Sequence, residues 1–403
     1  MVQLAELGQL AKLAQLAELL MAARQVQRRC TSLLVLQSTP FCNIDCRYCY
    51  LPHRSDRSRM PIETAVEAVN WLVREGLALD RISIAWHAGE PLVVPVEWYR
   101  EAFDAIDEAA VGRDVVHSIQ TNAMLINDDW CDLFLERNVQ IGVSIDGPKE
   151  LHDANRKTRT GAGTHAQAMR GIAHLRDSGV PFHVIAVVTA ATVSGCAVDF
   201  AAFMEDLRAE EIGLNFEEQE GVNLSSSLDP LAVAPEMRNF LTDLVDYAAR
   251  SPSLKMREMR TIAATLRDPE FGRRGRNSEN EPFAIVTVDV MGNLYTYSPE
   301  LAGQRSAHYQ NYRLGNVFQD RLAEIVTREP FLTLERDIAA GVAECSVKCP
   351  YFRLCQGGAP SNKIAELDTM RGTETTACRH YKQAISDVIL LRLEQDLGKC
   401  VRT

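Results

Sequence analysis

The sequence predicts an α/β protein in which an open arrangement of parallel strands is followed by a smaller, cysteine-containing C-terminal domain. Strand-like and helix-like segments alternate strictly between residues 31 and 216. Two separate groups of cysteines occur in the 403-residue chain. Strict alternation gives parallel strands joined by right-handed crossovers. A chain of this length exceeds the usual size of one domain, which favours one large and one smaller domain.

Six segments have the apolar, often β-branched composition of buried strands, and most are bounded by Gly, Pro or Asp. They cover residues 32–37, 81–87, 115–120, 140–145, 182–188 and 211–216. The helical patterns between them cover residues 62–75, 96–110, 128–138, 165–178 and 198–208. Six strands predict a partial, TIM-like (β/α)6 barrel, because a closed barrel needs eight. Chemistry is then expected at the C-terminal ends of the strands.

Pattern and composition divide the chain into four parts. The first is Leu/Ala-rich, with a leucine at every third residue, so a helix there has no single apolar face. The third combines helical patterns at 235–250 and 254–268 with a polar passage at 271–281, and the fourth opens with a hairpin around residues 292–293. The parts are an N-terminal extension (1–30), the partial barrel (31–234), a helical linker region (235–281) and the C-terminal domain (282–403).

The net charge of −11 argues against nucleic acid as the main partner, because phosphate contacts require a basic surface. Glu6, Lys12 and Glu18 interrupt the apolar N-terminal run, so it predicts neither a membrane span nor a signal peptide. Clustered thiols without an export signal indicate metal binding in a reducing cytoplasm. We therefore expect a cytoplasmic protein without a membrane partner.

Cys42, Cys46 and Cys49 follow the first strand with spacings of three and two residues. Thiolates are soft ligands that hold iron–sulfur clusters, and three of them leave one iron of a cubane open. A structural zinc site usually has two paired-cysteine knuckles and a closed fourth position. A disulfide framework does not suit a long chain without a secretory signal.

A second group of cysteines supplies four thiolates, which can close a cubane or hold zinc. This group consists of Cys345, Cys349, Cys355 and Cys378.

The first motif resembles the CxxxCxΦC signature of the radical S-adenosylmethionine (SAM) enzymes, with Tyr48 as the aromatic Φ. The resemblance implies a [4Fe-4S] cluster that binds SAM at its open iron. The segment 86–91 resembles the family's GGEP motif, in which backbone carbonyls and Glu90 hold the methionine ammonium group. Ala88 stands before Gly89 where a glycine is usual, and a methyl group is tolerable there if φ is negative.

The same resemblance assigns polar residues at the next two strand ends. It implies that Ser144 contacts the ribose region of SAM and that Arg156 binds the carboxylate, for which a planar guanidinium is suited. Gln120 and Asn122 end the third strand and are assigned to the same site. Asn122 and Asp146 are expected on its substrate side.

The segment 349–360 resembles the SPASM domain of peptide-modifying radical SAM enzymes, which usually carries two auxiliary clusters. Ala359 stands where the full pattern has a cysteine, and Tyr295 and Tyr297 stand where it has cysteines in the hairpin. The resemblance therefore implies one auxiliary [4Fe-4S] cluster, held by the four C-terminal cysteines.

Softer motifs at 294–301, 314–317, 357–363 and 372–375 resemble the cyclophane-forming peptide maturases, including those that act on glycine-rich-repeat precursors. This branch implies removal of a Cβ hydrogen from a ribosomal precursor peptide and a carbon–carbon crosslink to an aromatic ring. It also implies a low-potential electron donor, a flavodoxin or ferredoxin. Ser298 stands where sulfatase maturases have a catalytic Asp, and Glu300 is the nearest carboxylate, so Glu300 is the candidate base.

Other functions remain open on the sequence. Within peptide modification they are Cα-thioether formation, epimerisation and formylglycine formation. From a different class comes a non-catalytic iron–sulfur scaffold protein. Release of 5′-deoxyadenosine under dithionite separates the enzymes from the scaffold.

Iron content tests the predicted number of clusters. We expect about eight irons in each reconstituted chain, because three and four cysteines provide for two cubanes. A value of about twelve would contradict the assignment of a single auxiliary cluster.

Overall fold

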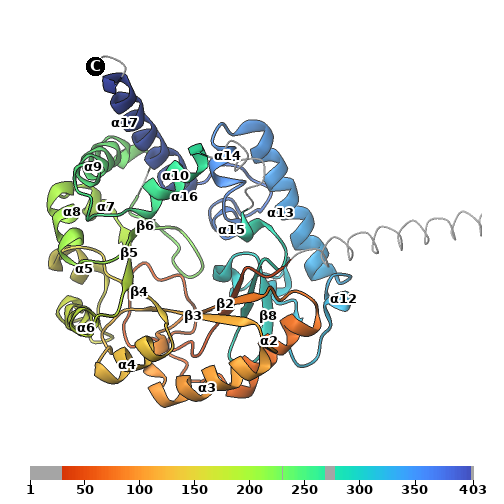
Figure 1. The fold of residues 1–403 in the computed structure, drawn as a ribbon. Helices are drawn as coiled ribbons and strands as arrows, with labels where there is room; N and C mark the ends of the chain where they lie inside the picture. The colour runs from red at the N-terminus through yellow and green to blue at the C-terminus, as the bar shows by residue number, and fades with distance from the viewer. Residues whose placement is uncertain (1–29, 229, 268–276, 401–403) are drawn as a thin grey trace, which may run out of the picture.

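The computed structural model describes residues 30–228, 230–267 and 277–400. Nearly all of the predicted N-terminal extension (1–29) and part of the predicted polar passage lie outside the described residues. The described strands form a single sheet of nine, in the order β6-β5-β4-β3-β2-β1-β7-β8-β9. Figure 1 looks into the arc that the sheet makes, with helices on its outer side.

The six predicted parallel strands are confirmed. Each pairs in parallel with the next, so their C-terminal ends meet at one edge of the sheet. Their apolar side chains are buried, as expected for strands covered by crossover helices. The strands are β1 (Leu33–Leu36), β2 (Arg81–Trp86), β3 (Asp114–Thr121), β4 (Gln140–Ser144), β5 (Phe182–Val188) and β6 (Ile212–Phe216).

The predicted crossover helices lie on the outside of the arc (Figure 1). They are α2 (Ile62–Arg74), α3 (Val96–Ala109), α4 (Asp128–Glu136), α6 (His165–Asp177) and α8 (Ala197–Asp206). The sequence did not predict two short helices, α5 (Lys149–Asn155) and α7 (Ala190–Val193), because each is too short to show a helical period. In the linker region, α9 (Pro230–Arg250) begins before the predicted start at Pro235, and α10 (Arg257–Arg267) follows it.

The predicted hairpin joins the barrel sheet. Strand β7 (Ile285–Val288) pairs antiparallel with β8 (Asn293–Thr296) and in parallel with β1, and the short β9 (Gly315–Asn316) pairs with β8. The sheet therefore continues across residue 282, where the sequence suggested a new domain. Strand β1 is held between β2 on one side and β7 on the other.

Helices after the hairpin close the open side of the arc (Figure 1). The last of them packs against α9 and α10 and so returns the chain to the barrel. They are α12 (Leu322–Ile325), α13 (Glu329–Lys348), α14 (Phe352–Cys355), α15 (Pro360–Leu367), α16 (Thr376–Cys378), the π-helix η5 (Arg379–Ala384) and α17 (Ile385–Cys400).

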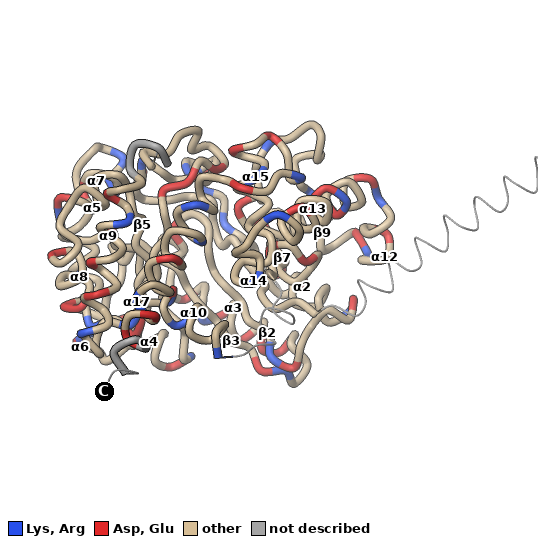
Figure 2. The backbone as a smooth tube through the Cα atoms, turned by 90° about the horizontal axis from the view of Figure 1, so that it is seen from above, with Lys and Arg blue, Asp and Glu red and all other residues tan. Residues whose placement is uncertain are grey.

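Acidic and basic positions are interspersed along the outer helices (Figure 2). Within the ranges that the structure describes, no helix is both long and apolar enough to cross a membrane.

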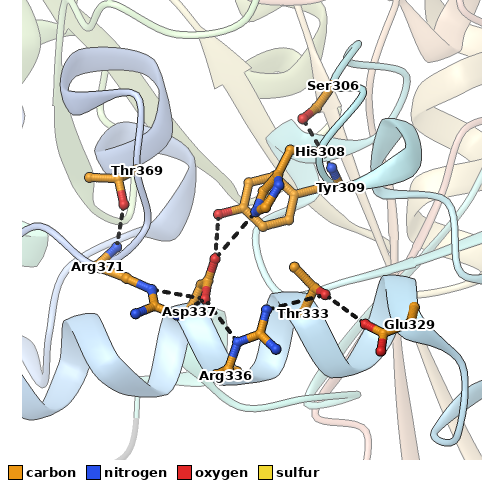
Figure 3. A network of polar contacts seen from close by, with 9 residues as sticks. All are labelled: Ser306, His308, Tyr309, Glu329, Thr333, Arg336, Asp337, Thr369 and Arg371. Atoms are coloured by element: carbon orange, nitrogen blue, oxygen red, sulfur yellow. Dashed lines mark hydrogen bonds and ion pairs between the residues drawn. The ribbon is translucent and has the colours of Figure 1, made fainter.

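One buried carboxylate ties the C-terminal helices together (Figure 3). Asp337 on α13 is 5% exposed and accepts hydrogen bonds from Arg371 at 2.7 and 3.0 Å and from the Tyr309 hydroxyl at 3.0 Å. His308 and Arg336 lie 3.6 and 3.4 Å from its oxygens. Although burial opposes ionisation, the hydrogen bonds from Arg371 and Tyr309 lower the pKa of Asp337.

We predict that Asp337→Asn lowers the free energy of unfolding by about 2 kcal/mol, because charge-assisted hydrogen bonds to a buried carboxylate are lost. The control is Asp104→Asn, which removes an exposed pair with Arg137 and should cost less than about 1 kcal/mol. Denaturant unfolding measures both. The Asp337 effect should be complete above pH about 4 and shrink as the pH falls through the lowered folded-state pKa. Equal losses in the two variants would contradict the structural role of this network.

Candidate active site

The cysteine motif lies at the C-terminal edge of the parallel strands, in the loop between β1 and α2. Cys42, Cys46 and Cys49 all line a cavity of about 260 Å³. The wall of this cavity also holds every predicted SAM-contacting residue except Ala88, namely Tyr48, Gly89, Glu90, Gln120, Asn122, Ser144 and Arg156. The strand-end reading of the sequence is thus consistent with the geometry.

Hydrogen bonds from three sides hold the cysteine loop. The Asn122 side chain donates to the Asn43 side chain at 2.7 Å, which ties the loop to the end of β3. Arg54 donates to the Cys46 carbonyl at 3.3 Å, and Arg159 donates to the Cys42 carbonyl at 2.9 Å. The loop is therefore positioned by the chain itself. Asn122 shapes the site as well as lining it.

The turn after β2 differs from the prediction. Ala88 has φ 73°, in the left-handed region, so the condition under which a methyl group is easily tolerated there is not met. An L-residue there costs about 1–2 kcal/mol, which explains why glycine suits this position. The next residue, Gly89, has φ 80°, and a Cβ on it would lie 2.3 Å from the Thr39 carbonyl oxygen and 2.8 Å from that of Phe41. The turn thus packs backbone to backbone against the start of the cysteine loop.

Glu90 links this turn to β3. Its Oε1 accepts hydrogen bonds from the Leu92 amide at 3.1 Å and the Thr121 hydroxyl at 2.6 Å, and its Oε2 accepts one from the Asn122 amide at 2.8 Å. Burial raises the pKa of Glu90, and these hydrogen bonds oppose the rise. Two carboxylate oxygens offer about four acceptor positions, so one remains for an ammonium group.

Gln120 and Ser144 form a polar pair on the cavity wall, where the Gln120 amide donates to the Ser144 hydroxyl at 2.8 Å. The glycine at position 142 makes room for this pair, since a Cβ on Gly142 would lie 2.1 Å from the Gln120 side-chain oxygen.

Arg156 is held by a buried carboxylate. Its Nε lies 3.0 Å from Asp146 Oδ1, and its guanidinium carbon lies 5.5 Å from the centre of the Tyr48 ring. The Tyr48 hydroxyl donates to the other Asp146 oxygen, and the Val187 amide donates to Oδ1 at 3.0 Å. Asp146 is 1% exposed. It therefore positions Arg156 and Tyr48, and does not lie on the substrate side as the sequence suggested.

The donor set fits an iron–sulfur cluster. The ten cysteines whose side chains the structure describes are all free thiols. Burial raises the pKa of Cys42 and of Cys46 to about 12, and the neighbouring Cys49 thiol adds to both rises. Among the described residues, no three His, Cys, Asp or Glu side chains are grouped to hold a single metal ion. A cubane binds its cysteines at separate irons and needs no such convergence.

The C-terminal cysteines also face one another. Burial raises the pKa of Cys345 and raises that of Cys378 to about 11, and Cys349 and Cys355 add to both shifts. Lys363, which is 3% exposed, donates to Cys345 Sγ at 3.6 Å. Four thiols with a buried cation beside one of them suit a closed cluster whose properties the lysine tunes.

A second cavity of about 210 Å³ extends from the first towards these cysteines. The two cavities share four lining residues, and Cys378, Lys363 and Lys382 line the far part of the second. The shared residues are Asn215, Glu218, Glu220 and Glu300. The hollow therefore runs from the first cysteine motif to the C-terminal group.

Three further glutamates of this hollow, of which Glu220 is buried and Glu218 and Glu279 are half-buried, were not predicted from the sequence. Burial raises the pKa of Glu218 to about 7, raises that of Glu220 well above its usual range and also raises that of Glu279. Glu218 and Glu220 follow β6 directly, so applying the strand-end argument to this strand would have found them. Glu279 lies just before the hairpin and does not follow a predicted strand, so that argument would not have found it.

Glu300, the predicted base, lies where the two cavities meet. Burial raises its pKa to about 8, and Glu279 and Glu218 add to the rise. Its Oε2 is buried and has no hydrogen-bond partner among the described residues. Ser298 is 1% exposed and donates to Glu279 at 3.3 Å, so it is not itself an available base.

Comparisons with known sequences identify the barrel. The family model of the Radical SAM superfamily matches residues 36–193. An uncharacterized protein of Synechocystis sp. is 38% identical over 374 residues, covering 91% of this chain and 93% of the relative. The serine-type anaerobic sulfatase-maturating enzyme of Bacteroides thetaiotaomicron is 25% identical over 371 residues, covering 86% of each protein.

Solved structures share the fold over most of the chain. The enzyme anSMEcpe with bound AdoMet and the Cp18Cys peptide aligns with a TM-score of 0.73 at 21% identity, covering 91% of this chain and 99% of that one. Streptococcus suis SuiB bound to precursor peptide SuiA aligns with a TM-score of 0.61 at 15% identity, covering 87% and 76%. These matches confirm the predicted fold class, including the region of the C-terminal cysteines.

We predict that Gly89→Ala impairs both stability and cluster loading, because its Cβ collides with the backbone before Cys42. The matched control is Gly112→Ala, with a similar φ of 77° but nothing within 4 Å of the added Cβ. The control should cost about 1–2 kcal/mol, from the left-handed strain alone. Gly89→Ala should cost at least about 1 kcal/mol more and bind less iron per chain. Equal iron loading in both variants would contradict the proposed packing of the turn on the loop.

Proposed function

Since the chain belongs to the radical SAM superfamily, we propose that it modifies a peptide by removing a hydrogen atom from a side chain held between the two groups of cysteines. The finer proposal is a crosslink between a Cβ of a ribosomal precursor peptide and an aromatic ring, forming a cyclophane. The observation that carries the proposal is the hollow that runs from Cys42, Cys46 and Cys49 to Cys378. Structural neighbours that hold bound peptides, anSMEcpe with the Cp18Cys peptide and SuiB with SuiA, support a peptide as substrate.

The residues at the barrel end are suited to hold SAM. Glu90 offers an acceptor position for its ammonium group, Arg156 a cation for its carboxylate, and Ser144 with Gln120 polar contacts for the sugar. When bound, SAM on its cluster supplies a radical that abstracts hydrogen, and a cluster on the four C-terminal cysteines supplies an electron acceptor. The chain provides the walls that exclude water from this chemistry.

Closing a ring onto an aromatic carbon requires the loss of one electron and one proton. Glu300 is placed to take the proton, because its Oε2 faces the junction of the cavities without a partner of its own. A carboxylate whose pKa lies near 8 is a stronger base than an ordinary glutamate.

A second candidate function is formylglycine formation. The similarity to sulfatase-maturating enzymes over most of the chain favours it. Two differences argue against it. Ser298 stands where sulfatase maturases have their catalytic Asp, and Tyr295 and Tyr297 stand where the full SPASM pattern has hairpin cysteines. This chain therefore lacks the residues that the resemblance associates with that reaction. Thioether formation, epimerisation and a scaffold role have no comparable structural support.

The deciding experiment is anaerobic co-expression with the short open reading frame beside the gene, followed by tandem mass spectrometry of the peptide. Crosslinking and the oxidation of a serine to formylglycine both remove two hydrogens, so mass alone does not separate them. A crosslink suppresses fragmentation across a short aromatic-containing motif and leaves no aldehyde for a hydrazine probe. A hydrazone product would replace the crosslink with formylglycine formation. An unchanged mass with deuterium gained at a Cα in heavy water would mean epimerisation.

We predict that the yield of modified peptide rises with pH through about 8, because Glu300 must be ionised to accept a proton. Glu300→Gln should abolish this pH dependence and lower the yield by about 10²-fold, while 5′-deoxyadenosine is still released.

The matched variant is Glu279→Gln, which removes a neighbouring negative charge and should move the rise to lower pH. A pH profile that is the same in both variants and the parent would exclude Glu300 as the base.

A further inference from the structure

A third hollow lies on the outer side of the cysteine loop, away from the cavities described above. It has a volume of about 730 Å³ and is lined by parts of the segments 45–55, 221–224 and 303–305, together with Arg159. Asp45, which lies between two of the cysteines, is part of its wall. Arg54 and Arg159, which hydrogen-bond to the carbonyls of Cys46 and Cys42, form another part. The groove thus reaches the backbone of the loop from the surface.

Three arginines, Arg54, Arg159 and Arg305, line this groove against one carboxylate, Asp45, although the protein as a whole carries a charge of −11. Arg159 and Arg57 both lie against the ring of Phe41, next to Cys42, with guanidinium carbons 5.0 and 4.6 Å from its centre. Lys157, two residues before Arg159, and Arg305, which lines the groove, are both exposed. Within the described residues, none of these four cations has a carboxylate within ion-pair distance, whereas Arg54 in the wall of the same groove pairs with Asp45 at 2.7 Å.

Exposed apolar side chains stand beside this basic rim. Leu224 is 78% exposed and Val222 is 47% exposed, both on the segment that forms one wall. An apolar centre within a rim of unpaired charge is the usual composition of a transient protein interface. The positive rim favours an acidic partner, and charge complementarity of this kind speeds association.

We propose that this groove is the docking site of a small, acidic electron-transfer protein that reduces the cluster on Cys42, Cys46 and Cys49. One electron leaves the reduced flavin or iron–sulfur centre of the partner and enters the cluster, and no bond is made or broken in the step. The inference rests on the proposed radical SAM function, which requires such a reduction. It assigns the partner to the outer face of the loop and leaves the inner hollow free for the peptide.

The test compares binding and turnover in a charge-reversal variant of the full, reconstituted chain. Arg57→Glu, Lys157→Glu and Arg305→Glu are combined, since their side chains do not contact the cysteines. The control combines Arg170→Glu, Arg208→Glu and Arg250→Glu, which make the same change of charge at exposed positions on or beside the outer helices α6, α8 and α9. The probe is flavodoxin with its reductase, and dithionite replaces the protein donor in parallel.

We expect the groove variant to bind oxidised flavodoxin at least about tenfold more weakly than the parent, by calorimetry at low salt. The flavodoxin concentration for half-maximal release of 5′-deoxyadenosine should rise by a similar factor, and turnover with dithionite should not change. The control variant should match the parent in all three measurements. High salt should weaken binding by the parent more than binding by the groove variant, because surface charges are then screened.

Three results would overturn the proposal. Unchanged flavodoxin binding in the groove variant would place the donor elsewhere. An equal loss of flavodoxin binding in the control variant would mean that the loss comes from the change in net charge and not from the groove. A loss of dithionite turnover would mean that these side chains serve the cluster itself. Failure of the parent to release 5′-deoxyadenosine with dithionite would instead contradict the radical SAM function, so the two failures are distinguishable.

Discussion

The position of β1 between β2 and β7 is the constraint on which the site depends. Because all three strands run in parallel, the cysteine loop after β1 emerges between the barrel and the C-terminal helices. The same pairing brings the hairpin to this edge, and the chain after β8 places Glu300 against the cavity that the cysteines line. The barrel and the hairpin thus share one sheet, and together with the C-terminal helices they enclose one hollow.

The polar groups around this hollow fall into two kinds. Near the cysteine loop they are satisfied by one another, since Glu90 accepts three hydrogen bonds and Asp146 holds Arg156 and Tyr48. Such a network is rigid and keeps each ligand-facing group in place. Towards the C-terminal cysteines, by contrast, glutamates that are buried or half-buried raise one another's pKa values. Burial and mutual repulsion therefore supply groups that can exchange protons near neutral pH.

The sequence predicted the parts of the fold that depend on local pattern. The six strands and the crossover helices have a clear period and clear boundaries, and both cysteine groups have informative spacing. The resemblance to the radical SAM enzymes also assigned Glu90, Gln120, Asn122, Ser144 and Arg156 to one site, and all of them line one cavity.

What the sequence could not show depends on contacts between distant segments. The parallel pairing of β1 with β7 joins residues about 250 positions apart, and no local pattern encodes it. Ala88 adopts a left-handed φ against the preference of alanine, next to Gly89, whose backbone packs closely on the cysteine loop. Asp146 lies just after β4, where a substrate-facing residue is expected. It is instead buried and paired with Arg156, which it holds in position. Glu279 comes from a polar segment, and only the folded chain brings it to Glu300.

The most direct test of the account is the transfer of deuterium from the peptide to 5′-deoxyadenosine. The precursor peptide, labelled with deuterium only at its Cβ positions, is turned over anaerobically, and the 5′-deoxyadenosine is analysed by mass spectrometry. The account predicts one deuterium in the nucleoside, in step with modified peptide, because the hydrogen comes from a side chain held in the hollow. Unlabelled 5′-deoxyadenosine alongside modified peptide would contradict it, since the abstracted hydrogen would then come from elsewhere.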